Sequence, residues 1–270
     1  MGNRPKKILV AYVMPGFPEP DSAIEILKSA EKAGVDLIEL GVPFSDPLAD
    51  GPVIQGAAQV AIENGISPRK ILGIVKNFRK KSDLPIVLMG YMNSFLNGIG
   101  KDFPNELGSA GVDGVIIPDL SLEESTPVKE SIEDAGLSLV LLSAPTSTDD
   151  RIKKISDAAT DFVYCVSITG VTGARTNLVS KDVTDFLKRV RKLSHKPFVV
   201  GFGISTPETA MEIARYSDGI VVGSALLQKI SSAAKLKRDE AVFKFLRGLR
   251  TAIDNCPEEI RIAAGQGRRK

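Results

Sequence analysis

The sequence predicts a single α/β domain folded as a (β/α)8 TIM barrel, and three observations indicate this fold class. Eight short apolar, β-branched runs are spread along the 270 residues, and amphipathic segments separate them. The runs are almost continuously apolar, which is typical of parallel strands buried on both faces. Eight strand–helix alternations in a chain of this length favour a closed barrel. The alternative is a doubly wound open sheet, which needs a reversal of strand order.

The expected strands lie at residues 8–13, 35–40, 84–89, 112–117, 138–143, 161–166, 197–202 and 219–224. Helical periodicity is clearest over residues 23–33, 71–78 and 183–193. Capping residues mark the ends of helices: Ser67-Pro68 and Ser205-Thr206-Pro207 suit helix starts, and Gly34, Gly111 and Gly136 suit helix ends. We expect the barrel to occupy residues 1–255, and residues 256–270 to form a C-terminal extension that is flexible or was added by cloning.

Two intervals between successive strands, after the second and after the sixth, are longer than the others. The loops that follow barrel strands form the active-site face. Extra chain at these two places therefore indicates a functional lid or wall.

Composition excludes several function classes. The 35 basic and 33 acidic residues nearly cancel, which gives no reason to expect a nucleic-acid or membrane partner. No stretch of about 18 uncharged apolar residues is present to span a bilayer. Two cysteines cannot build a disulfide framework or a four-thiolate metal site. We therefore expect a reduced, cytoplasmic protein without a metal.

Two carboxylates are the candidates for acid–base chemistry. Glu39 lies inside an apolar strand, where loss of water raises the pKa of a carboxyl and prepares it to give and take a proton. The alternative is a structural carboxylate with a fixed partner. Asp50 follows in a loop stiffened by Pro47, Gly51 and Pro52. Alone, Asp50 suits a turn or the N-cap of a helix near Pro52, but beside Glu39 it suits a second site carboxylate.

Three glycine-bearing turns follow late strands, at residues 170–174, 201–205 and 223–225. Backbone amides and helix N-termini at such turns bind phosphate in many barrels, although a glycine at a strand end is often only a turn. The only histidine, His195, precedes the seventh strand, which excludes a histidine-rich metal centre and a serine–histidine triad at the active-site face. No lysine lies late in a strand to form a Schiff base, and Cys165 is expected in the core.

The segment at residues 37–52, LIELGVPFSDPLADGP, closely resembles the tryptophan synthase alpha subunit family, as do IPDL at 117–120, SITGVTG at 167–173 and GFGIS at 201–205. The resemblance spans roughly residues 7–253. It implies a lyase of tryptophan biosynthesis that cleaves indole-3-glycerol phosphate to indole and glyceraldehyde 3-phosphate. It also implies a beta-subunit partner that holds pyridoxal phosphate, in an α2β2 tetramer, with no cofactor in this chain.

The resemblance also implies residue roles. It places Glu39 and Asp50 as catalytic residues, and residues 43–50 with Asn93 at the partner interface. The implied substrate-binding residues are Tyr12, Tyr91, Ile116, Tyr164, Thr172 and Phe202, and the implied phosphate-binding residues are Gly173, Gly203, Gly223 and Ser224. Phe17 and Ile168 stand where many members of the family have Asp and Arg, so closure of the loop after the sixth strand is expected to differ.

Such a cleavage suits the two carboxylates, because protonation of the indole ring at C3 creates the electron sink that no lysine or metal supplies here. Two alternatives stay open at this point. One is another phosphate-binding barrel enzyme of aromatic amino-acid biosynthesis, whose usual Lys–Glu or Cys–Asp pair we do not find. The other is a mainly regulatory subunit of the beta chain.

Overall fold

The computed structural model of the chain describes residues 6–166, 180–201 and 203–257. It contains one closed barrel of eight parallel strands, in which each strand pairs with the next and the last with the first. The strands are β1 (Ile8–Val13), β2 (Leu37–Gly41), β3 (Ile86–Met89), β4 (Gly114–Ile116), β5 (Ser138–Ser143), β6 (Val163–Val166), β7 (Phe198–Gly201) and β8 (Gly219–Val222). The predicted TIM barrel is confirmed, and the open sheet is excluded.

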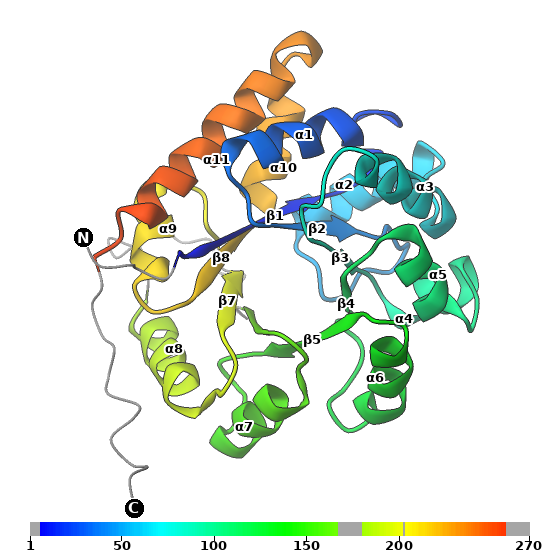
Figure 1. Cartoon of the computed structure of the whole chain (residues 1–270). Coiled ribbons are helices and arrows are strands. Elements are labelled where there is room, and N and C mark those ends of the chain that lie inside the picture. The colour runs from blue at the N-terminus through cyan, green and yellow to red at the C-terminus, as the bar shows by residue number, and fades with distance from the viewer. Residues whose placement is uncertain (1–5, 167–179, 202, 258–270) are drawn as a thin grey trace, which may run out of the picture.

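Helices surround the strands on the outside of the barrel (Figure 1). They are α1 (Ala23–Ala33), α2 (Pro52–Glu63), α3 (Pro68–Arg79), α4 (Met92–Gly98), α5 (Phe103–Ala110), α6 (Ser125–Asp134), α7 (Asp149–Ala158), α8 (Lys181–Leu193), α9 (Pro207–Ala214), α10 (Ser224–Ser232) and α11 (Arg238–Asp254), with a 3-10 turn at Lys235–Lys237. The long interval after β2 holds two of them, α2 and α3, and part of the interval after β6 lies outside the described residues.

The predicted helix boundaries follow from local chemistry. The side chains of Ser67 and Thr206 accept the backbone N–H groups of Lys70 and Thr209 and so cap α3 and α9. Gly34 takes a left-handed φ of 91° at the end of α1, a conformation that costs glycine least. The chain can therefore turn back into the next strand at this point.

Two apolar layers make up the core. Side chains that point outward from the strands pack under the helices in the larger layer, whereas the inner layer fills the barrel. The inner layer consists of Val10, Leu37, Val87, Ile116, Val140, Tyr164, Val199 and Val221. Because these side chains fill the lower barrel, a cavity can form only above them, at the carboxyl ends of the strands.

The opposite end of the barrel is closed by charged hydrogen bonds. Three aspartates immediately before even-numbered strands accept a backbone N–H of the preceding strand and an arginine from an outer helix. These arginine–aspartate pairs are Arg250–Asp36 at 2.7 Å, Arg79–Asp113 at 2.5 Å and Arg191–Asp218 at 2.9 Å. The partly exposed pairs of Asp113 and Asp218 contribute about 0–1 kcal/mol each, and the Arg250–Asp36 pair, whose guanidinium is buried, contributes more. The residues that stabilise the fold are thus separated from the end that carries the cavity.

The C-terminal helix α11 packs between α1 and α9 (Figure 1). Cys256 follows it and is buried, with its Sγ 3.4 Å from the carbonyl oxygen of Met211. The packed part of the chain therefore includes this first residue of the expected extension, and residues 258–270 lie outside the described residues. No helix in the described ranges is long and apolar enough to cross a membrane.

Candidate active site

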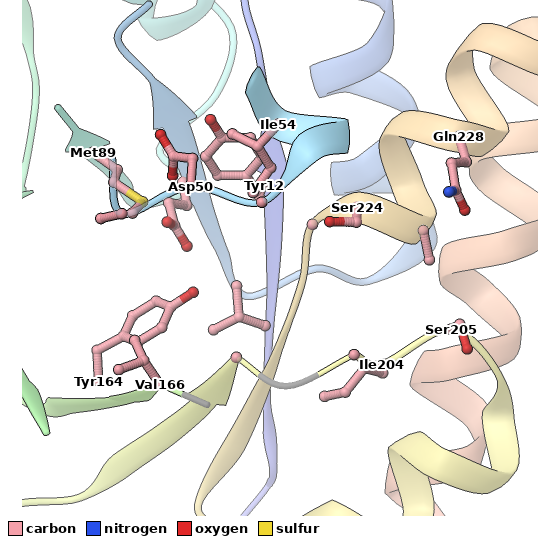
Figure 2. Close-up of a pocket in the computed structure, with 18 residues that line it drawn as sticks. Tyr12, Asp50, Ile54, Met89, Tyr164, Val166, Ile204, Ser205, Ser224 and Gln228 are labelled. Atoms are coloured by element: carbon pink, nitrogen blue, oxygen red, sulfur yellow. The ribbon is translucent and has the colours of Figure 1, made fainter. Parts of the chain in front are cut away.

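A cavity of about 280 Å³ opens at the carboxyl ends of the strands. Figure 2 shows Tyr12, Asp50 and Met89 at one end of it, with Tyr164 across from them, and Ser224 and Ser205 at the other end. Its lining consists of Tyr12, Glu39, Ala49, Asp50, Gly51, Ile54, Met89, Tyr164, Val166, Gly201, Gly203, Ile204, Ser205, Val221, Gly223, Ser224, Ala225 and Gln228. The cavity therefore joins a carboxyl-bearing end to an end built from glycine turns and hydroxyl groups.

Glu39 reaches the cavity because of its place in β2. Side chains alternate along a strand, so Leu37 and Glu39 both point into the barrel, with Leu37 in the inner apolar layer below. Glu39 has no solvent exposure, and neither carboxyl oxygen has a hydrogen-bond partner among the described residues. Burial, and secondly the charge of Asp50, raises its pKa to about 8. Glu39 therefore holds a proton at neutral pH and has no structural partner to lose.

Asp50 is held in position by Tyr91. The Tyr91 hydroxyl donates to Asp50 Oδ2 at 3.2 Å and accepts the backbone N–H of Ala49 at 2.9 Å. The Tyr91 ring in turn stacks on Phe44, with 5.1 Å between ring centroids. Burial raises the pKa of Asp50 to about 6, although the Tyr91 hydrogen bond lowers it. Asp50 is thus ionised at pH 7 beside a protonated Glu39.

The N-cap role considered for Asp50 does not match the structure. Helix α2 has Gly51 at its N-cap and no side-chain cap there. Asp46 accepts the Ser45 hydroxyl at 2.6 Å in an exposed part of the loop. The loop instead directs Asp50 into the cavity and leaves Asp46 at the surface.

Two tyrosines form the walls beside Glu39, and a glycine makes room for each. Tyr12 pairs with Glu39 in the β1–β2 register, and a Cβ at Gly41 would lie 2.2 Å from the Tyr12 hydroxyl. A Cβ at Gly201 would lie 2.5 Å from the Tyr164 hydroxyl. Burial raises the pKa of both phenols, which therefore stay protonated and can donate hydrogen bonds into the cavity.

The far end of the cavity is suited to an anion. Gly223 occupies the N-cap of α10 and offers no side chain to the backbone N–H groups of the first turn, which also contains no acidic residue. Gly203 and Ser205 reach the same cavity from the loop after β7. Open backbone donors at a helix N-terminus favour a phosphate or carboxylate.

The structure places the other predicted residues as follows. Tyr91 and Ile116 are not among the described residues of the lining; Tyr91 lies behind Asp50, and Ile116 packs in the inner layer. Thr172, Gly173 and Phe202 lie outside the described residues, as does Ile168. His195 is exposed in the turn before β7, and Cys165 is buried in the outer layer.

Sequence reasoning missed Ile54, Met89 and Gln228 as lining residues, whereas Ser205 belongs to the predicted turn at 201–205. Met89 ends a predicted strand, and Gln228 stands one helical turn after Ser224, so position within an element was the available signal. Among the described residues no group of three or more His, Cys, Asp or Glu side chains is placed to hold a metal ion.

A closed (β/α)8 barrel with a protonated and an ionised carboxyl in one cavity is the arrangement of an acid–base enzyme. Comparison with known proteins identifies which one. The sequence model of the family described as "Tryptophan synthase alpha chain" matches residues 1–252. The chain belongs to this family of lyases, and its reaction is the cleavage of indole-3-glycerol phosphate.

Individual relatives and solved structures support this family assignment. The tryptophan synthase alpha chain of Dehalococcoides mccartyi is 45% identical over 250 residues, covering 92% of this chain and 96% of that protein. The solved tryptophan synthase subunit alpha of Legionella pneumophila has a TM-score of 0.84 at 36% identity, covering 93% and 94% of the two chains. A solved α2β2 tryptophan synthase complex from Pyrococcus furiosus contains a chain with the same TM-score and identity, covering 90% of this chain and 98% of that one.

Proposed function

We propose that Glu39 is the general acid and Asp50 the electrostatic partner in the cleavage of indole-3-glycerol phosphate by this chain. The observation that carries the proposal is the Glu39 carboxyl, which is fully buried, lacks a hydrogen-bond partner among the described residues and has a pKa raised to about 8. Such a group can deliver a proton at neutral pH to a substrate atom that enters the cavity.

The proposed reaction uses only these two side chains: Glu39 gives and takes back a proton, and Asp50 stabilises charge. Glu39 transfers its proton to C3 of the indole ring, which becomes a cationic indolenine. The Asp50 carboxylate accepts the ring N–H, whose acidity has increased, and stabilises the charge. Loss of the hydroxyl proton from the carbon attached to C3 forms the aldehyde while the carbon–carbon bond breaks and its electrons return to the ring. The Glu39 carboxylate can take that proton and is thereby restored.

The phosphate of the substrate is proposed to lie at the far end of the cavity. Gly203, Gly223 and Ser224 line that end and, with the open first turn of α10, supply neutral hydrogen-bond donors. Gly173 is expected to join them. Binding of the phosphate at a distance from the reacting bond contributes binding energy that orients the indole ring between Glu39 and Asp50.

A beta subunit is proposed as the partner, in an α2β2 tetramer, with pyridoxal phosphate bound in the beta chain. The loop over residues 43–50 presents Leu48, which is 93% exposed, and the exposed Asn93 borders the same groove as Pro43 and Phe44. An exposed apolar side chain beside a groove suits a protein contact. Asp50 lies on this loop, so docking there can change the catalytic geometry. We also propose a cytoplasmic location, which suits the two free cysteines.

Release of indole from indole-3-glycerol phosphate, measured with and without a beta subunit, tests the proposal. Indole formation that depends on Glu39 supports it. No indole from the wild-type chain, even with the beta subunit, would overturn it. A Glu39→Gln chain that still activates the beta subunit but forms no indole separates catalysis from a purely regulatory role.

A further inference from the structure

The proposed phosphate end of the cavity carries no cation among the described residues. Its lining includes neither lysine, arginine nor histidine, whereas Glu39 and Asp50 supply carboxyl groups at the other end. A phosphate there must be bound by backbone dipoles and neutral side-chain donors. Gln228 carries the one side-chain amide in the described lining, and its NH2 group offers two such donors.

The position of Gln228 on α10 brings its amide toward the proposed anion. Gln228 stands four residues after Ser224, so the two side chains share one face of the helix. Helical side chains lean toward the N-terminus, so the Gln228 amide can reach back toward the first turn. Figure 2 shows Gln228 with Ser224 and Ser205 at one end of the pocket, away from Tyr164 and Met89.

The Gln228 side chain is exposed and has no hydrogen bond to any described residue. The amide is therefore available to a ligand, and a change at this position should not disturb the core. The open N-terminus of α10 and this amide supply donors from two directions, one along the helix axis and one from its flank.

We propose that Gln228 is a further substrate-binding residue that donates its amide N–H to the phosphate and favours phosphorylated over unphosphorylated substrates. This inference rests on the proposed function, because it places the phosphate at the N-terminus of α10. It adds a side chain outside the glycine turns and makes phosphate recognition depend on neutral donors. The residue takes no part in the proton transfers.

Two variants test the proposal, Gln228→Leu and Gln228→Glu, assayed with the beta subunit present. Gln228→Leu removes the donor at similar size, and the KM for indole-3-glycerol phosphate and the inhibition constant of inorganic phosphate should each rise about tenfold. Gln228→Glu adds a repelling charge, and both constants should rise at least thirtyfold. The kcat of each variant should stay within about twofold of wild type.

Gln59→Leu is the matched control, because Gln59 is an exposed glutamine on α2 outside the cavity lining, and it should leave both constants unchanged. KM and inhibition constants within twofold of wild type in both Gln228 variants would overturn the inference, as would a fall in kcat with unchanged KM. Failure of the proposed function itself has a different signature, since the wild-type chain would then release no indole.

Discussion

Replacement of Glu39 by Gln should greatly lower kcat and, at the same time, make the protein more stable at high pH. The folded-state pKa of Glu39, about 8, lies above the ordinary pKa of 4.5 that the side chain has in an unfolded chain. Between these values the folded protein keeps a proton that the unfolded chain releases, so wild-type stability falls as pH rises through this window. The full difference corresponds to roughly 5 kcal/mol above pH 8.

Glutamine resembles the protonated carboxyl in size and polarity but does not ionise. Below pH 4.5 the two proteins should therefore have nearly equal free energies of unfolding. Toward pH 8.5 the Glu39→Gln variant should become more stable by several kcal/mol, with part of the 5 kcal/mol lost to water that enters the cavity. For a chain of this size each kcal/mol raises Tm by about 2–4 °C. Loss of the proton donor should lower kcat by at least about 10²-fold.

The assay combines denaturant unfolding at pH 4.5, 6.5 and 8.5 with indole release at neutral pH. Glu130→Gln is the control, because Glu130 is exposed on α6 and its loss should leave both activity and the pH dependence of stability unchanged. If the difference in free energy of unfolding between Glu39→Gln and wild type stays constant across pH, the inference that Glu39 is a buried carboxyl with a raised pKa is refuted. A kcat within tenfold of wild type would refute its role as the acid.

Three further changes test other parts of the site and fold. In Tyr91→Phe the hydrogen bond that lowers the pKa of Asp50 is lost, so the acidic limb of kcat/KM, expected near pH 6, should move to higher pH; an unmoved limb would contradict this. In Gly41→Ala the new Cβ would lie 2.2 Å from the Tyr12 hydroxyl, so activity should fall at least tenfold while the fold persists by circular dichroism; wild-type kinetics would disprove the close contact. Arg250 is 2% exposed and forms ion pairs with Asp36 and Asp254. Arg250→Met should therefore reduce the free energy of unfolding by about 2–4 kcal/mol and leave kcat unchanged. A reduction below about 0.5 kcal/mol would show that these ion pairs contribute little to stability.

The elements of the barrel could be predicted because their signals are local. Apolar runs and capping residues lie next to the boundaries that they determine, and the ends of α1 match its predicted range. The order of the strands followed from the eight strand–helix alternations, which favour a closed barrel. Glu39 stood out as a carboxyl inside an apolar strand, and Asp50 as a carboxyl in a stiff loop; the family resemblance over residues 37–52 then implied catalytic roles for both.

The sequence by itself determined the fold class and the family, and it singled out Glu39 and Asp50 as candidate site carboxylates, since each of these inferences rests on residues that are near one another in the chain. Only the tertiary structure decided that Glu39 lacks a partner among the described residues, that Tyr91 lies behind Asp50 rather than in the lining, and that Gln228 borders the proposed phosphate end. Burial and pKa depend on side chains that arrive from several different strands. Closure of the barrel brings these side chains together, and a linear pattern does not record their distances.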